Sequence, residues 1–280
     1  MADTLSEKQI REFQEKILSW YAKNQRDLPW RKTRDPYNIL ISEIMSQQTQ
    51  ISRVVPKYDA WIKELPTLTD LATAPISTVL RLWSGLGYNR RALYLQKAAK
   101  VIIETYAGEF PLTGEELQKL PGIGKYTASA IACFAYNAQI PVIDTNIRKV
   151  ILVHFGDQIP DGRSEEKRVQ EIAWKLLPKG NAYHWNQALM DYAGAELKAY
   201  KIPVPKQSKL LGSDRYYRGQ TLKYLLSAKS TGHRVTVNTL LEYFEGKSQT
   251  IVKKRFEQIL SGMESEGFIK RRNETILLPD

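Results

Sequence analysis

The sequence is poor in the residues that build metal centres and covalent cross-links. Its 280 residues include one cysteine, Cys133, and three histidines. A single thiol excludes an internal disulfide, a zinc site with four cysteine ligands and an iron–sulfur cluster held only by cysteines of this chain. The histidines are scattered and lack metal-ligand spacing: His154, His184 and His233. We therefore expect no metal site and no cofactor built from these side chains.

Long hydrophobic runs are also missing. No stretch approaches the roughly 18 consecutive apolar residues that indicate a membrane-spanning helix. The first sixteen residues, MADTLSEKQIREFQEK, are charged throughout and contain no apolar signal core. We therefore expect a cytoplasmic protein that does not bind a membrane.

Positive charge, by contrast, is abundant. The chain has 41 Lys and Arg against 30 Asp and Glu, a formal net charge of +11, and its 42% apolar residues are enough for a buried core. Such an excess favours a polyanionic partner, with nucleic acid ahead of an anionic membrane surface, although a merely soluble surface is the alternative.

The pattern of apolar residues predicts a mainly α fold in two parts. Helical spacing recurs near 36–50, 88–106, 126–136, 145–155 and 164–177, and strand-like alternation is scarce before residue 205. We expect a helical domain over 1–203, a linker over 204–213 and a second domain over 214–280. In the second domain, helices near 215–228, 236–245 and 249–265 and two short strands around Asn273 predict a small winged-helix-like α+β module.

This C-terminal module carries much of the excess charge. Residues 206–280 contain 14 Lys and Arg against 8 Asp and Glu. The balance suits a module that faces DNA. A basic domain that only packs against the first domain explains it equally well.

A glycine-containing segment, Leu120–Gly124 (LPGIG), separates two helical stretches and is followed by Lys125. Gly122 and Gly124 allow a tight connection with exposed backbone N–H groups, and the next helix presents its positive end. A simple helix–helix turn with a glycine cap is the alternative. The whole string matches a helix-hairpin-helix element, which grips a DNA backbone without reading sequence.

Glu43 lies in a helix that we expect to begin with Asp35 as its cap and Pro36 as its first residue. Helical spacing places Glu43, Gln47 and Gln50 on one face. The flanking residues are mostly Ile and Leu, and desolvation by such neighbours raises the pKa of a carboxyl group toward that of a general acid. A solvated surface position is the alternative for a single Glu in a helix.

Asp144 follows an apolar, strand-like lead-in, Ile140–Ile143, which should bury much of its carboxylate. Helix capping is the simple interpretation, because an apolar run starts directly after it. One protonated and one ionised carboxyl would also suit cleavage of a glycosidic bond through a cationic sugar. In DNA this bond is N-glycosidic, and the base must first be flipped out of the stack.

Several segments in order resemble the helix-hairpin-helix DNA glycosylase superfamily over roughly residues 8–200, and within it the adenine DNA glycosylases of the MutY type. The matching strings are LPWRKTRDPYNILISEIMSQQTQ, TLTDLATAPISTVLRLWSGLGY, LPGIGKYTASAIACFAYN, VIDTNIRKV and WNQALMDYAGA. The resemblance implies a base excision repair enzyme that removes adenine mispaired with 8-oxoguanine or guanine. Its partner would be mismatched or damaged double-stranded DNA, and we expect a monomer.

The resemblance also implies roles for single residues. Glu43 would protonate adenine, and Asp144, supported by Asn146, would stabilise the cationic sugar. Tyr126 stands where strand-cleaving relatives have a lysine, which implies a monofunctional glycosylase. The residues expected at the base pocket are Trp30, Arg31, Ser46 and Gln187. Those expected to contact DNA are Gln47, Gln48, Thr49, Leu86, Gly87, Tyr88, Gly122, Gly124 and Lys125, and a monovalent cation at the glycine segment is compatible with the pattern.

The sequence departs from the family pattern in three places. The four cysteines that usually follow the position of Asp191 and hold a four-iron cluster are missing, so packing by Tyr192, Leu197, Tyr200 and Ile202 must replace the cluster. The larger family domain that recognises 8-oxoguanine is replaced by the short C-terminal module. Ser46 occupies a site that is usually apolar, which could alter the base pocket.

Two other functions remain open from the sequence. A thymine or uracil glycosylase acting opposite guanine also combines Tyr126 with Asp144 and does not need Glu43. A non-catalytic winged-helix DNA-binding protein would need neither carboxylate.

Overall fold

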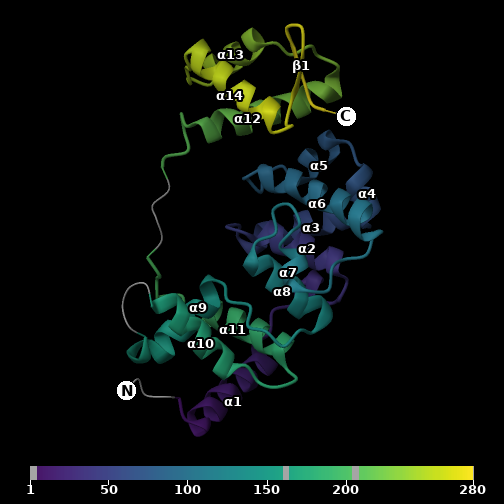
Figure 1. The fold of residues 1–280 in the computed structure, drawn as a ribbon. Helices are drawn as coiled ribbons and strands as arrows, with labels where there is room; N and C mark the ends of the chain where they lie inside the picture. The colour runs from purple at the N-terminus through teal and green to yellow at the C-terminus, as the bar shows by residue number, and fades with distance from the viewer. Residues whose placement is uncertain (1–4, 160–163, 204–207, 280) are drawn as a thin grey trace. The chain divides into compact units, whose positions relative to one another are not determined.

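The computed structural model describes residues 5–159, 164–203 and 208–279, and most of these residues lie in α-helices (Figure 1). They divide into two compact units. The first contains the described residues of Met1–Ile44 and Phe110–Pro205, and the second those of Met45–Glu109 and Lys206–Asp280. The chain therefore leaves the first unit, forms part of the second, returns, and ends in the second.

The first unit consists of helices from two separate segments of the chain. Its elements are α1 (Glu7–Asn24), η1 (Pro29–Arg31), most of α2 (Pro36–Ser46), α7 (Gly114–Leu117), α8 (Lys125–Tyr136), α9 (Thr145–Phe155), η2 (Gly156–Gln158), α10 (Glu165–Leu176) and α11 (Ala182–Glu196).

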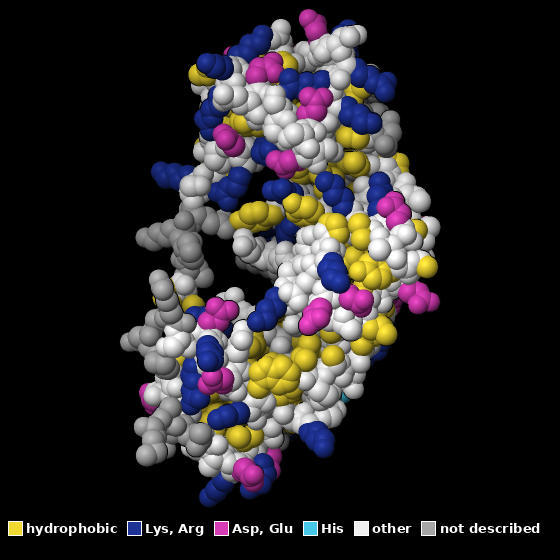
Figure 2. Space-filling view, in the orientation of Figure 1, with side chains coloured by type: hydrophobic (Ala, Val, Ile, Leu, Met, Phe, Trp, Pro, Cys, Tyr) yellow, Lys and Arg dark blue, Asp and Glu magenta, His cyan; other side chains and the backbone are white. Residues whose placement is uncertain are grey.

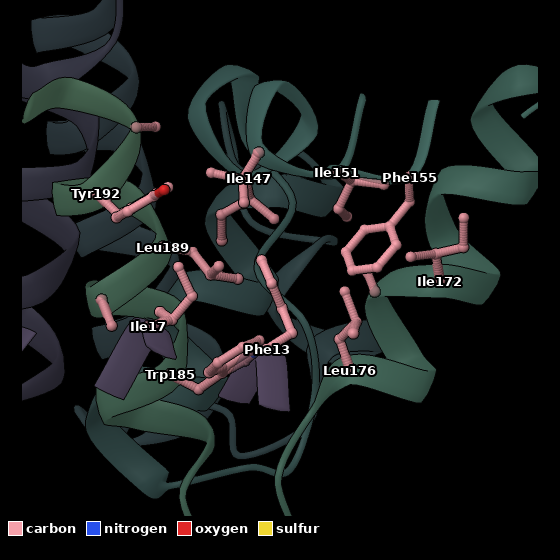
Figure 3. Packing of buried hydrophobic residues seen from close by; sticks show 14 of the residues in the cluster. Phe13, Ile17, Ile147, Ile151, Phe155, Ile172, Leu176, Trp185, Leu189 and Tyr192 are labelled. Atoms are coloured by element: carbon pink, nitrogen blue, oxygen red, sulfur yellow. The ribbon is translucent and has the colours of Figure 1, made fainter. Parts of the chain in front are cut away.

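The core of this unit is formed by the apolar faces of α1, α9, α10 and α11 (Figure 3). Phe13 of α1 packs edge-on against Phe155 and Trp185, with ring centroids 5.0 and 6.0 Å apart. Ile17 and Ile151 are fully buried in the same cluster. Each large buried side chain of this kind contributes about 1.5–3 kcal/mol to folding. This packing fixes the start of α9, where Asp144 lies.

The second unit joins an internal group of helices to the C-terminal module. Its elements are α3 (Ile51–Glu64), α4 (Leu68–Thr73), α5 (Ile76–Trp83), α6 (Arg90–Tyr106), α12 (Asp214–Thr231), α13 (Val237–Glu245), α14 (Lys253–Ser265), β1 (Lys270–Arg272) and β2 (Thr275–Leu277). The predicted domain limits at 203 and 214 differ from this division of the chain and stay a prediction. Residues 204–207 of the predicted linker lie outside the described residues.

The C-terminal module has the elements predicted for a winged helix. Three helices precede an antiparallel hairpin in which Arg271 pairs with Ile276. The Ile276 N–H also donates to the carbonyl of Val235, which lies between α12 and α13, at 2.8 Å. Phe244 and Phe256 are fully buried in the core of this module. The predicted mainly α fold with a small terminal strand pair is confirmed.

Two local predictions were wrong. The helix expected over 36–50 ends at Ser46, because Gln48 has a left-handed backbone with φ 53° that an α-helix cannot contain. Gln47 and Gln50 therefore do not share a helical face with Glu43. The lead-in to Asp144 forms no strand in the described structure. Its Val142 N–H instead donates to the Asn186 side chain at 2.8 Å.

Helix starts, in contrast, follow their predicted caps. The Asp35 carboxylate accepts from the Tyr37 N–H at 2.8 Å, and α2 begins at Pro36. Asp144 caps α9 by accepting from the Ile147 N–H at 2.7 Å. Among the described helices, none is long and apolar enough to span a membrane.

Candidate active site

Glu43 lies on α2 among buried apolar neighbours and touches a phenol. The flanking Ile41 and Ile44 are buried, and the Tyr126 hydroxyl donates to Glu43 Oε2 at 2.9 Å. The pKa of Glu43 is raised from 4.5 to about 7, mainly by burial; the charge of Asp144 adds to this rise, and the Tyr126 hydrogen bond opposes it. This carboxyl group is therefore able to hold and release a proton near neutral pH.

Tyr126 remains a neutral donor in this arrangement. Burial, together with the charges of Glu43 and Asp144, raises the pKa of its phenol well above 10. The side chain comes from the first turn of α8, directly after the glycine segment. It can orient the Glu43 carboxyl, but it does not offer an ionised nucleophile at neutral pH.

Asp144 is held by donors that favour its ionised form. Its Oδ1 accepts from the Ile147 N–H at 2.7 Å, and its Oδ2 accepts from the Asn146 amide at 2.7 Å. Burial raises the pKa of Asp144, and these hydrogen bonds oppose that rise. The positive end of α9 acts in the same direction. Helix capping and a role in the site therefore coexist in one side chain.

Arg31 forms a buried ion pair with Asp191 of α11. Its two terminal nitrogens donate to the two carboxylate oxygens at 2.7 and 2.8 Å. Arg26 also donates to this carboxylate, from its backbone N–H at 2.9 Å and its Nε at 2.5 Å. The Asp191 side chain is only 1% exposed, and these contacts hold its pKa below the ordinary value against the effect of burial. Breaking such a pair costs about 3–5 kcal/mol.

The other residues expected at the base pocket have mixed surroundings. Trp30 lies in η1 and Gln187 in α11, and both side chains are buried. Ser46 is the last residue of α2 and is half-buried. Arg31 is also close enough to Glu43 for its charge to lower the pKa of that carboxyl, although burial outweighs this effect.

The glycine segment connects α7 to α8 as expected. Gly122 has φ 78°, a conformation that favours glycine, and the Ile123 N–H donates to the Leu120 carbonyl at 3.1 Å. Gly124 is the N-cap of α8, so no side-chain cap bonds the first N–H groups of that helix. Lys125 is exposed at the start of the same helix. This end of α8 has the features of an anion-binding site.

The Gln loop (Gln47–Gln50) and the Tyr loop (Ser84–Asn89) belong to the second unit and are joined by one arginine that the sequence reasoning missed. Arg91 Nη1 donates to the Gln47 carbonyl at 2.6 Å. Its Nη2 donates to the carbonyls of Leu86 and Gly87 at 3.2 and 3.1 Å. Burial lowers the pKa of Arg91.

Both loops contain backbone strain at non-glycine residues. Gln48 has φ 53° and Tyr88 has φ 48°. Such conformations persist where surrounding contacts impose them, and they cluster at functional sites. Tyr88 is 44% exposed, whereas Leu86 is buried. Of the residues in the Tyr loop that we expected to contact DNA, the one with an exposed aromatic ring is therefore Tyr88.

The residues present do not fit the four-iron cluster of the resembling family. Four thiolates are needed, and the only cysteine is Cys133, which is buried in α8 and contacts Asn186 at 3.4 Å. Burial raises the pKa of its thiol to about 11. Within the described residues there is also no group of three or more His, Cys, Asp or Glu that could hold a metal ion.

The packing expected to replace the cluster is present in part. Tyr192 is buried, and Leu197 packs against the core of the first unit. Tyr200 is 42% exposed and Ile202 is half-buried, and their predicted packing role stays a prediction.

Residues 41–179 match the model of the HhH-GPD superfamily of base excision DNA repair proteins. The chain belongs to this superfamily, and the resemblance drawn from its sequence motifs is confirmed.

Its relatives are named as glycosylases. The chain is 44% identical over 178 residues to the adenine DNA glycosylase of Mycolicibacterium smegmatis, which covers 62% of this chain and 60% of the relative. It is 37% identical over 209 residues to that of Homo sapiens, covering 71% and 38%. The chain thus spans between two fifths and three fifths of these two relatives.

Solved structures share the fold. A thermostable thymine-DNA glycosylase superposes with a TM-score of 0.63 at 31% identity, covering 72% of this chain and 91% of that one. An endonuclease III trapped on DNA gives a TM-score of 0.61 at 22% identity, covering 74% and 95%, which is a likeness of fold.

Proposed function

We propose that the chain is a monofunctional DNA glycosylase of base excision repair that removes adenine opposite 8-oxoguanine or guanine. The observation that carries the proposal is the Glu43 carboxyl, whose pKa burial raises to about 7 and which accepts from Tyr126. A group of this kind suits protonation of a purine that leaves as a neutral base. The curated relatives named adenine DNA glycosylase support the same target.

The proposed reaction divides the work between the two carboxyl groups. Glu43 donates its proton to the flipped adenine as the N-glycosidic bond lengthens, which removes negative charge from the leaving base. Asp144 acts in its ionised form, to which Asn146 and the Ile147 N–H donate, and stabilises the positive charge that develops on the sugar. Water then completes the hydrolysis at the anomeric carbon.

No amine nucleophile is needed in this scheme. Tyr126 is a neutral phenol whose pKa lies well above 10, and it already donates to Glu43. It therefore orients the acid and forms no covalent bond to the sugar. The proposed product is an abasic site in an uncut strand.

Recognition of the base and of the DNA backbone forms a second part of the proposal. The Arg31 Nε is buried and has no hydrogen-bond partner among the described residues, which makes it available to a bound base. Trp30 and Gln187, which belong to the same unit as Arg31, complete the proposed pocket.

The Gln loop and the Tyr loop would face the opposite base and the stack, through Gln47, Gln48, Thr49 and Tyr88. The end of α8 at Gly122, Gly124 and Lys125 would hold a backbone phosphate, with or without a monovalent cation. The partner is double-stranded DNA, and we propose a monomeric protein.

A second target has a specific observation in its favour. The thymine-DNA glycosylase structure covers most of its own chain in the superposition and is 31% identical to this one. Removal of thymine or uracil opposite guanine does not require Glu43 as an acid, because a pyrimidine leaves as a stabilised anion. A raised pKa at Glu43 therefore favours adenine.

The test is single-turnover base release from four duplexes, followed by alkali to reveal abasic sites. The duplexes carry adenine opposite 8-oxoguanine, adenine opposite guanine, thymine opposite guanine and uracil opposite guanine. We expect release of adenine, fastest opposite 8-oxoguanine. Release of only thymine or uracil would support the second target, and release from none of them would leave the non-catalytic DNA-binding protein.

A further inference from the structure

The C-terminal module combines its own buried core with a surface rich in cations. Tyr217, Phe244 and Phe256 pack edge to face, with ring centroids 5.0 and 5.3 Å apart. The hairpin β1–β2 is tied to α14 because Arg271 donates to Glu257 at 2.9 Å. The module therefore holds its helices and its hairpin in a fixed relation, which a surface for a rigid partner requires.

Several of its basic residues are already engaged inside the second unit. Arg218 pairs with Glu266 at 2.7 Å, and Arg255 pairs with Asp214 at 2.6 Å. Lys229 donates to Ser77 of α5 at 2.9 Å. The Lys229 contact shows that α12 packs against α5, whereas the two arginine pairs lie within the module. These contacts do not involve the other basic residues of the module.

Four further cations are exposed along α14 and the hairpin. We call Lys253, Lys254, Lys270 and Arg272 the wing surface; all four side chains are exposed, and none forms an ion pair with another described residue. Figure 2 shows Lys and Arg side chains spread over the C-terminal module, with Asp and Glu between them.

These four residues lie on α14 and on the hairpin, two elements that Arg271 connects. Lys253 precedes Glu257 by one helical turn on the same face of α14, and Glu257 holds Arg271 at 2.9 Å. Lys270 and Arg272 flank Arg271 in β1, on the face of the hairpin opposite to it. The two pairs of cations therefore lie on a helix start and on a hairpin that Arg271 ties to that helix, and the hairpin pair is on the face that points away from Arg271.

The acids of the same region are largely neutralised. Glu257 and Glu264 both pair with Arg271, at 2.9 and 3.4 Å. Within the described residues of this region, the exposed Glu274 in the hairpin turn forms no ion pair. The N-cap of α14, Val252, offers no side-chain cap, so the positive end of that helix adds to the local field.

We propose that the wing surface binds the phosphate backbone of duplex DNA, independently of any damaged base. A helix start and a neighbouring hairpin, both basic, match the two elements with which helix-turn-helix proteins and their wings contact a duplex. The proposed contacts are sequence-independent, because lysine and arginine would bind phosphates and no amide or aromatic side chain is needed to contact the bases. The module thereby adds a DNA grip outside the matched family region of residues 41–179.

The test measures binding of the full chain to an undamaged duplex at a series of salt concentrations, with fluorescence anisotropy of the labelled duplex as the readout. A variant in which the four residues of the wing surface are changed to Gln should lower the slope of log affinity against log salt. The decrease should be about 0.9 for each phosphate that is no longer neutralised, so about 2 to 4 in all. Removing the neighbouring acid, by Glu274→Gln, should raise affinity.

The matched control removes the same number of charges elsewhere. It carries Gln at four exposed lysines that lie outside the module: Lys23, Lys63, Lys167 and Lys175. We expect a slope close to that of the unchanged protein. An unchanged salt slope in the wing variant would overturn the proposal and would favour a protein partner for this surface. An equal decrease of the slope in the control would also overturn it.

Base release separates this proposal from the proposed function. The wing variant should still release adenine at saturating protein, because its substitutions lie outside the acidic pair. Thermal unfolding of both variants checks that the fold is intact. If the unchanged chain releases no base but the wing variant still has a lower salt slope than the unchanged chain, the glycosylase function is refuted and the proposal for the wing surface is supported.

Discussion

Replacing Glu43 by Gln should stabilise the protein above neutral pH while it abolishes release of adenine. Burial raises the pKa of this carboxyl from 4.5 to about 7, so at about pH 8 the folded protein holds a carboxylate in surroundings that disfavour its charge. The difference between the two pKa values corresponds to about 3 kcal/mol. Because Glu43 is partly exposed and water screens its charge, we expect a gain of about 1 to 3 kcal/mol.

The sign of this effect depends on pH. The unfolded chain loses the Glu43 proton near pH 4.5, whereas the folded protein loses it near 7. Between these values the unfolded state binds fewer protons, so the free energy of unfolding falls as pH rises, and above 7 it stays lower by the full amount. The variant with Gln does not titrate here. Its advantage should therefore vanish below about pH 4.5 and be largest above about 7.

Urea unfolding of the variant and of the unchanged protein, at about pH 4.5 and at about pH 8, measures the difference in the free energy of unfolding at each pH. The matched control is Glu104→Gln on the exposed face of α6, which should change stability by less than about 0.5 kcal/mol at either pH. A Glu43→Gln variant that is less stable at about pH 8, or whose stability difference does not change with pH, would refute the assignment of Glu43 as a carboxyl destabilised by burial. Unchanged adenine release would refute its role as the acid.

Three further outcomes follow from single contacts. Tyr126→Phe removes the hydrogen bond that lowers the pKa of Glu43, so the alkaline limb of the pH–rate profile should move to higher pH; a limb that stays in place would contradict this. Asp144→Asn should abolish base release but retain duplex affinity within about threefold in anisotropy, since Asn can still cap α9. Arg91→Lys should lower stability by about 1–3 kcal/mol in urea unfolding, because a lysine cannot reach all the carbonyls that this guanidinium bonds.

Features that depend on neighbouring residues were predictable from the sequence. The start of α2 at Pro36 follows from the Asp35 cap, and the start of α9 follows from Asp144. The terminal hairpin around Asn273 was predicted from alternation and a turn residue, and Asn273 does have a positive φ of 56°. In each case the deciding contact spans only a few residues.

Features imposed from far along the chain were missed. The end of α2 depends on Arg91, which is 44 residues from the Gln47 carbonyl that it bonds. The pairing of Arg31 with Asp191 spans 160 residues, so the sequence suggested a pocket position for Arg31 without its partner. Helix spacing and apolar flanks did predict the raised pKa of Glu43, but its Tyr126 partner, 83 residues away, required the fold.

The end of α11 shows how this chain can do without a cluster at the place where its family usually has one. Trp20 donates from its indole to Glu196 at 2.9 Å and packs edge-on against Tyr192, with ring centroids 5.4 Å apart. Asp191, one position earlier, is fixed by Arg26 and Arg31. The last turns of α11 are therefore attached to α1 and to the segment after it by an exposed hydrogen bond, an aromatic contact and a buried ion pair, at the place where cluster ligands would follow Asp191. Because the same ion pair places Arg31 near Glu43, the contacts that fix this end of the helix also help to order the proposed active site.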